Sequence, residues 1–340
     1  MNLLKFLLTN QLKRPRQSNK TGGFTLIELL VAVVLAFLVI APLLGFMVNI
    51  MQTDRNEQAK ANSEQEIQAA LDYISRDLQQ AVYIYDQDAL TTPHAPLGSP
   101  SGIKDQIPPD SGAIDGCPSG TSCVPVLAFW KLENMQEVVP INNGTDCLTV
   151  SDSERQEKCN DAKVYSLVVY YRIQDDPCTA PWSCAARIGR FEINDGVRGT
   201  DGDNRNTPQD ESYVDEGDDT IGRDPGFAPF NLDEQGTLDK KMKVWEKASE
   251  PYTKPVQILV DYIDKEEDPN TGQGKGFAVN FTDTNPDVDI VDLVVDVSIR
   301  GNALARIRKG EPPVYNQSAA AYFPQSSVRI KGLGLLNNTK

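Results

Sequence analysis

The first strong pattern in the chain is an apolar run that begins at Phe24 and continues to Met51. It contains one ionisable side chain, Glu28, and one proline, Pro42. A helix of about 20 apolar residues is long enough to cross a bilayer, so residues 24–50 are predicted to form a transmembrane helix. Pro42 lacks an amide proton, and we expect the helix to kink or loosen there.

A second helical pattern follows the apolar run. Apolar residues recur at spacings of three or four, which places them on one helix face: Ile67, Leu71, Ile74, Leu78 and Val82. Polar residues occupy the opposite face: Glu64, Gln68, Asp72, Arg76 and Gln79. We therefore expect residues 51–85 to continue the helix outside the membrane, with its apolar face packed against a globular core.

Short segments rich in β-branched and aromatic residues follow the helix. The expected strands are 124–130, 163–173, 187–193, 255–262, 276–281, 290–299 and 321–330. The alternation is clearest before Arg300, where Val295, Val297 and Ile299 suit the buried face of an antiparallel strand. One long helix followed by antiparallel strands predicts an α+β fold, with a β-rich globular domain over residues 86–340.

Two long inserts interrupt the expected strands. Residues 86–116 contain five prolines, which forbid a continuous helix or a central strand, and are predicted to form a surface loop. Residues 194–235 are poor in apolar side chains and rich in aspartate and glycine. Long loops of this kind are either functional or disordered.

The acidic insert contains one candidate metal site, at Asp201 and Asp203. Calcium takes about six to eight oxygen ligands from a flexible loop, and these aspartates alternate with glycine as such a loop requires. Arg205 stands where an EF-hand would supply an oxygen, and Ser212 stands in place of its final glutamate, so the segment is not an EF-hand. The alternatives are a structural calcium or a solvated acidic loop.

Charge is distributed unevenly along the chain. The formal net charge is −15, and the first 23 residues contain five basic residues and no acid, so the remainder carries −20. Basic residues before the apolar run and acidic residues after it predict a cytoplasmic N-terminus and an exported C-terminal domain. Such a negative domain does not suit nucleic acid, because phosphate binding needs clustered lysine and arginine.

Six cysteines lie within one segment of the expected exported domain: Cys117, Cys123, Cys147, Cys159, Cys178 and Cys184. Pairing each cysteine with its neighbour in the sequence would close three local loops. Six cysteines allow fifteen different disulfide connectivities. An even number in an exported segment indicates disulfides. Zinc is the alternative, but the spacings exceed those of usual zinc sites and the single histidine, His94, lies outside the segment.

Patterns typical of enzymes are scarce. A Ser-His-Asp or Cys-His site would depend on His94 alone, which lies in a proline-rich loop. The glycines of residues 272–276 lack the following Ser or Thr of a phosphate-binding loop. We expect a protein without enzymatic activity; a membrane-anchored exported enzyme is the alternative.

The residues around the start of the apolar run resemble a known processing signal. Gly23 is followed by Phe24-Thr25-Leu26-Ile27-Glu28-Leu29-Leu30 and preceded by a basic segment. This sequence resembles the class III signal of type IV prepilins and type II secretion pseudopilins. The resemblance covers about the first sixty residues. It implies a leader at residues 1–23, cleavage between Gly23 and Phe24 by prepilin peptidase, N-methylation of Phe24, and a role for Glu28 in assembly.

The same resemblance implies a pilin-like architecture and a location. The long helix would pack on an antiparallel sheet, and its membrane half would contact lipid and then other pilins or pseudopilins. At Pro42 the helix would partly melt in the filament, or simply bend. Size, cysteines and inserts are most similar to the large J- and W-type minor pseudopilins, and to a cyanobacterial class associated with hormogonium polysaccharide secretion.

The function expected from this resemblance is that of a minor pseudopilin in the cytoplasmic membrane. The protein would be a single-pass subunit of a type II secretion-like or type IV pilus-like filament that assists export of protein or polysaccharide. The alternative is a minor pilin displayed at a pilus tip as an adhesin or assembly primer.

Overall fold

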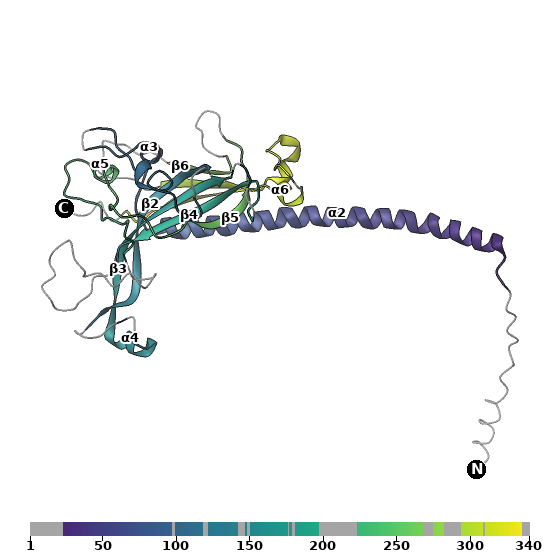
Figure 1. Ribbon diagram of the computed structural model, residues 1–340, viewed down its shortest axis with the longest axis horizontal. Coiled ribbons are helices and arrows are strands. Elements are labelled where there is room, and N and C mark those ends of the chain that lie inside the picture. Colours follow the sequence, from purple (N-terminus) through teal and green to yellow (C-terminus); the bar gives the residue numbers. More distant parts are fainter. Residues whose placement is uncertain are drawn as a thin grey trace, which may run out of the picture. The chain divides into compact units, whose positions relative to one another are not determined.

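The computed structural model describes residues 23–96, 99–117, 122–141, 147, 150–175, 177–178, 181–196, 223–267, 275–281, 294–308 and 310–334. The chain divides into two units, residues 1–54 and 55–340, and the long helix α2 (Leu26–Gln79) contributes to both. The α+β class expected from the sequence is confirmed, because antiparallel sheets follow this helix (Figure 1).

The second unit contains two antiparallel sheets (Figure 1). The larger has the order β1-β2-β3-β4-β5, formed by Ala81–Ile84, Ser122–Pro140, Cys159–Gln174, Ala186–Asn194 and Gln257–Ile263. The smaller has the order β6-β7-β8, formed by Phe277–Phe281, Val294–Arg300 and Gln325–Lys331. A single bridge between Ile263 and Gly301 joins the end of β5 to the end of β7. The strands expected from alternation are all present where the structure describes them.

Short helices complete the second unit. The α-helices are α3 (Gln87–Thr91), α4 (Asp152–Lys158), α5 (Leu238–Lys243) and α6 (Leu304–Ile307), and the 3₁₀ segments are η1 (Lys104–Gln106) and η2 (Gln317–Tyr322). Three starts are capped by side chains, as at Asp86, whose carboxylate accepts the Ala89 amide at 2.9 Å. Such a cap satisfies an amide that has no partner inside the helix.

One core lies between α2, the larger sheet and the smaller sheet. The expected stripe on α2 is buried, with Ile67, Ile74 and Leu78 each at most 1% exposed. These residues pack with Phe129 of the larger sheet and Ile330 of β8, among others. Burying a side chain of this size contributes about 1.5–3 kcal/mol. The helix therefore holds the two sheets together through one apolar face.

A second core covers the other face of the larger sheet and is rich in aromatic residues. Trp130 of β2 meets Phe227, Phe230 and Trp245 edge to face, with ring centroids 5.0–5.7 Å apart. Aromatic pairs prefer this geometry because the positive edge of one ring faces the negative face of another. Phe227 and Phe230 belong to the insert predicted at 194–235, so its described end is part of the domain core.

The sequence-based boundaries need three corrections. The helix predicted to reach residue 85 ends at Gln79, and Ala81–Ile84 instead forms β1, which pairs with β2. The insert at 86–116 is not only a surface loop: it contains α3 and η1, and buries Leu90 and Ile107 in the aromatic core. In both segments, tertiary packing overrides the local pattern.

The third correction concerns strand length, since β2 and β3 run beyond the rest of the sheet. Their ladder continues through Leu132 and Met135 to Pro140, and α4 lies at the far end of this two-stranded ribbon (Figure 1). A three-residue irregularity interrupts the ladder after Met135, and Val138 packs there against Val164. This small apolar cluster stabilises the ribbon outside the two main cores.

Candidate functional site

The N-terminal end of α2 is capped by its own residues. The Glu28 amide donates a hydrogen bond to Thr25 Oγ1 at 3.4 Å, and the Leu29 amide donates to the Thr25 carbonyl at 3.2 Å. A threonine followed by glutamate three residues later is the signature of a capping box, which fixes a helix start. The sequence contained this signal, although the role of Thr25 was not inferred from it.

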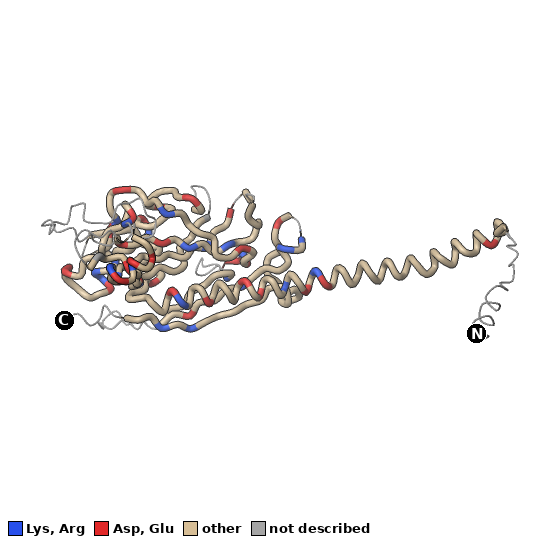
Figure 2. The backbone as a smooth tube through the Cα atoms, turned by 90° about the horizontal axis from the view of Figure 1, so that it is seen from below, with Lys and Arg blue, Asp and Glu red and all other residues tan. Residues whose placement is uncertain are grey.

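The candidate site residues at this end are all accessible. Phe24 is 80% exposed, and every residue from Gly23 to Asp54 is exposed within the chain itself. Glu28 is the only charged residue of the helix before Asp54, and Figure 2 shows the uncharged stretch between them. This part of α2 is long and apolar enough to cross a membrane. An exposed apolar surface of this extent requires lipid or other protein to cover it.

Pro42 does not end the helix. The residues on both sides remain helical from Leu26 to Gln79. Since proline has no amide proton, the Leu38 carbonyl lacks its usual donor four residues later. A kink or partial melting at this position stays a prediction.

A short match to a known family covers the start of this region. Residues 18–44 match the family described as the prokaryotic N-terminal methylation motif. This prepilin-type motif and the long apolar helix that follows it support the type IV pilin or pseudopilin family. Comparison with curated proteins and with solved structures found no match. The matched residues include Gly23, Phe24 and Glu28, so the resemblance seen in the sequence is confirmed.

The prepilin-type motif carries two consequences for partners. It implies processing by a prepilin peptidase and assembly with other pilins. Together with the apolar helix it indicates anchoring in a membrane. Residues 1–22 of the leader expected at 1–23 lie outside the described residues, and the cleavage itself stays a prediction.

We expect the mature protein to begin at a methylated Phe24, as mass spectrometry of its N-terminal peptide would show. A Cβ atom built at Gly23 meets nothing within 4 Å in this chain. The fold therefore does not require glycine at this position, and we expect any such requirement to come from the peptidase. Gly23→Leu is expected to block cleavage, whereas Gly23→Ala is expected to allow partial cleavage.

Gly45→Leu is the matched control for this prediction, because the Cβ position of Gly45 is equally open and Gly45 lies inside α2, away from the expected cleavage point. This variant should be cleaved like the natural sequence. A protein that still begins at Met1 in a host with active prepilin peptidase would contradict the processing prediction.

The six cysteines form three disulfides between sequence neighbours. The pairs are Cys117–Cys123, Cys147–Cys159 and Cys178–Cys184. These are the three local loops expected from the sequence, and no cysteine is left as a thiol. Zinc binding by these residues is thereby excluded in this state of the protein, because each sulfur atom is already bonded to another.

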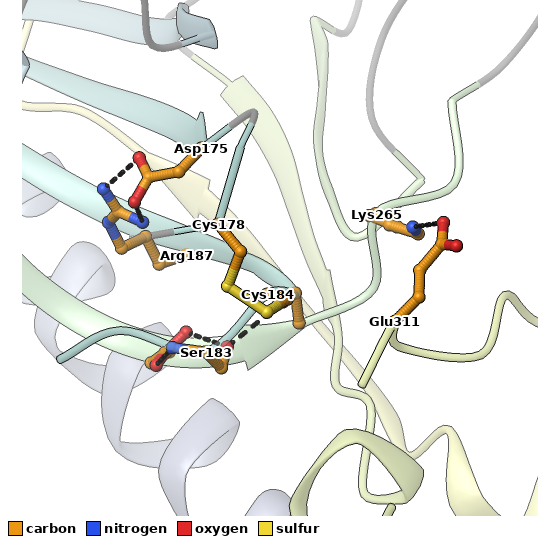
Figure 3. The surroundings of a disulfide bond; sticks show 9 residues. Asp175, Cys178, Ser183, Cys184, Arg187, Lys265 and Glu311 are labelled. Carbon is orange, nitrogen blue, oxygen red and sulfur yellow. Dashed lines mark hydrogen bonds and ion pairs between the residues drawn. A yellow bond between two sulfur atoms is a disulfide. The ribbon is translucent and has the colours of Figure 1, made fainter. Parts of the chain in front are cut away.

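The Cys178–Cys184 loop is further held by its surroundings (Figure 3). Ser183 donates from its amide to Asp261 Oδ2 at 2.8 Å, and its hydroxyl donates to Oδ1 of the same carboxylate. Beside the disulfide, the Arg187 guanidinium forms two hydrogen bonds to Asp175, at 2.8 and 3.0 Å. A bidentate pair of this kind is geometrically specific. The disulfide therefore joins a loop already tied to β4 and β5.

We expect the exported protein to contain no free thiol. Alkylation of the unfolded protein without reduction should add no label, whereas alkylation after reduction should label all six cysteines. Removing one bridge is expected to lower the free energy of unfolding by about 2–5 kcal/mol. Labelling of two or more cysteines without reduction would show that the pairing is incomplete in the cell.

The proposed calcium ligands cannot be placed. Asp201 and Asp203 lie outside the described residues. Among the residues that the structure does describe, no group of three or more His, Cys, Asp or Glu side chains is arranged to hold a metal ion. His94 lies in the described part of the 86–116 insert, where its amide donates to Asp105 at 2.7 Å.

A buried charged cluster, which the sequence did not reveal, connects α2 to the larger sheet. Asp77 is 8% exposed and accepts hydrogen bonds from Tyr170 and from Arg190 Nε, each at 2.7 Å. Lys131 Nζ lies 3.5 Å from Asp77 and 2.6 Å from Glu192, which also pairs with Arg190. The helical pattern did not single out Asp77, because its partners come from strands far along the chain.

The cluster shifts the pKa of its central carboxyl. Burial alone would raise the pKa of Asp77, but the hydrogen bond and charge of Arg190, with the charge of Lys131, outweigh burial and hold the pKa below its ordinary value. Burial also raises the pKa of the Tyr170 hydroxyl, so it stays protonated and donates to Asp77. The carboxylate is therefore charged and fully paired at neutral pH.

Proposed function

We propose that this protein is a minor pseudopilin, a non-enzymatic subunit of a type II secretion-like or type IV pilus-like filament in the cytoplasmic membrane. The observation that carries the proposal is the prepilin-type motif, continuous with a 54-residue helix. The second half of that helix supplies one wall of a core. Such a subunit would use its apolar helix to enter the filament and would export its C-terminal domain, stabilised by disulfides.

A second candidate function is that of a minor pilin at a filament tip, acting as an adhesin or assembly primer. The feature that favours it is the size of the second unit, which contains more than one helix packed on one sheet. The aromatic core and the β2–β3 ribbon add surface that packing of α2 does not require. Lack of catalysis is part of both proposals, and it is supported by the single histidine and by three disulfides that leave no reactive thiol.

Deletion of the gene, with complementation, separates the two functions. A minor pseudopilin predicts loss of exported protein or polysaccharide while surface attachment stays intact. A tip adhesin predicts the opposite result. If secretion and attachment both stay at the level of the parent strain, neither role is correct.

A further inference from the structure

A surface cavity of about 470 Å³ lies in the second unit, between α3, residues 99–101 and α5. Its size falls within the ~300–1,000 Å³ typical of sites for small molecules. Thr92, Ser99 and Ser101 contribute hydroxyl groups to its lining, and Asp88 and Lys240 contribute charges. Pro100 and Val244 complete the lining with apolar surface, so the cavity combines apolar walls with both donors and acceptors of hydrogen bonds.

Hydrogen bonds fix the walls of this cavity in place. Asp86 caps α3 and also accepts from Lys243 Nζ of α5 at 2.6 Å. Lys243 pairs in addition with Asp239 at 2.9 Å, and its carbonyl accepts from the Ser101 hydroxyl at 2.8 Å. These contacts join all three segments that line the cavity. A ligand would thus enter a preformed site and would not have to order it, which lowers the cost of binding.

Charges of both signs surround the cavity. The ammonium group of Lys243 lies between the carboxylates of Asp86 and Asp239, and these three groups together carry a net negative charge. The charges on Asp88 and Lys240 are opposite in sign, exposed, and without an ion pair among the described residues. An anion would meet the Asp88 carboxylate and a strongly acidic domain, and a cation would meet Lys240.

We propose that this cavity binds a neutral, hydroxyl-rich ligand, namely one or two sugar rings of an uncharged glycan. A sugar hydroxyl can donate to the Asp88 carboxylate and accept from the Lys240 ammonium, and serine and threonine hydroxyls do both. Hydrogen bonds to a charged group are roughly twice as strong as neutral ones, so Asp88 and Lys240 supply most of the selectivity. The proposal does not depend on which filament the protein joins.

The test uses the full mature chain in phosphatidylcholine nanodiscs, since detergents with sugar headgroups would compete. Saturation-transfer NMR is recorded with maltotriose, cellotriose, mannotriose and chitotriose, and with glucuronate and inorganic phosphate for comparison. At least one neutral trisaccharide is expected to bind. Asp88→Asn and Lys240→Met should each weaken that binding about tenfold or more, because each removes a charged hydrogen-bonding partner.

Asp72→Asn is the matched control, because Asp72 is an exposed aspartate of α2 outside the cavity lining, and it should bind like the natural sequence. Binding of none of the four trisaccharides by a folded chain overturns the proposal. Binding that survives both Asp88→Asn and Lys240→Met also overturns it, as does preferential binding of phosphate or glucuronate. None of these readouts measures secretion or attachment, so a negative result leaves the proposed filament role intact.

Discussion

Replacing Glu28 with alanine is expected to leave cleavage and membrane insertion intact and to remove the protein from the assembled filament. Glu28 is the only charged side chain of the apolar half of α2, and it lies in the first turn of the helix. A lone carboxylate at bilayer depth costs about 2.5–3.5 kcal/mol, which a partner of opposite charge offsets. Cleavage creates such a partner, the amine of Phe24, which stays positive when methylated.

The amine of Phe24 is expected to find its partner in another subunit. The Glu28 amide is bonded to Thr25, so the first turn is fixed as a capped helix. We expect the Phe24 amine to pair with the carboxylate of a neighbouring subunit. Such a pair would set the axial register that apolar packing alone specifies poorly. This pairing is the mechanism proposed for assembly.

Crosslinking of the variant to its partner pilins or pseudopilins measures the effect. Glu64→Ala is the matched control, because Glu64 is an exposed glutamate of the same helix outside the apolar run. We expect Glu64→Ala to crosslink like the natural protein and Glu28→Ala to lose its crosslinks. If Glu28→Ala still crosslinks and supports secretion, the helix acts only as an anchor.

Asp77→Ala is expected to destabilise the second unit strongly. The substitution removes the acceptor shared by Tyr170 and Arg190 and leaves the Arg190 and Lys131 charges with the half-buried Glu192 as their shared remaining partner. Breaking a buried ion pair by removing one member typically costs about 3–5 kcal/mol. Denaturant unfolding of the full chain, followed by tryptophan fluorescence, should show a loss of this size, since Trp130 and Trp245 are buried.

Two further measurements distinguish the loss of the Asp77 cluster from the effect of substituting any residue of α2. Asp72→Ala, on the exposed face of the same helix, should change the free energy of unfolding by no more than about 0.5 kcal/mol. In addition, Asp77→Ala and Arg190→Ala together should cost less than the sum of the single changes, by about 0.5–3 kcal/mol. Strict additivity would mean that the two side chains do not stabilise the fold as a pair.

The pH dependence of stability provides an independent check on Asp77. Its pKa is lowered in the folded protein, so the carboxylate stabilises the fold at all pH values above its unfolded pKa. That contribution is lost as the pH falls below about 4 and the folded group becomes protonated. The natural protein should therefore lose stability more steeply below this pH than Asp77→Ala does.

Periodicity in the sequence predicted the regular elements well. The stripe at Ile67, Leu71, Ile74 and Leu78 identified the buried helix face, and alternation identified seven of the eight strands. The helix end was wrong because Val82 continues the helical spacing, whereas pairing with β2 draws the β-branched and aromatic residues after Gln80 into a strand. The spacing of apolar residues within a segment does not reveal long-range pairing of this kind.

The candidate sites also differ in whether their residues are neighbours in the sequence. Processing residues form a continuous motif, so Gly23, Phe24 and Glu28 could be recognised from the sequence alone. The Asp77 cluster and the cavity beside α5 could not, because their members are distant in the chain: Asp77 and Arg190 are 113 residues apart. The aromatic core was missed for a related reason, since Phe227 and Trp245 lie in short segments that show neither helical spacing nor alternation.

The position of β8 in the chain imposes an order of events on synthesis and export. Ile330 completes the core that Ile67 begins, and Gln68 donates to Ser326 across 258 residues of sequence. Contacts between such distant segments form late and slowly. While the intervening chain is still being made, the apolar face of α2 stays uncovered beside the membrane, in a form prone to aggregation. A nascent chain interrupted before Gln325 would lack β8, leave the part of this face that Ile330 covers exposed, and become a substrate for proteolytic quality control.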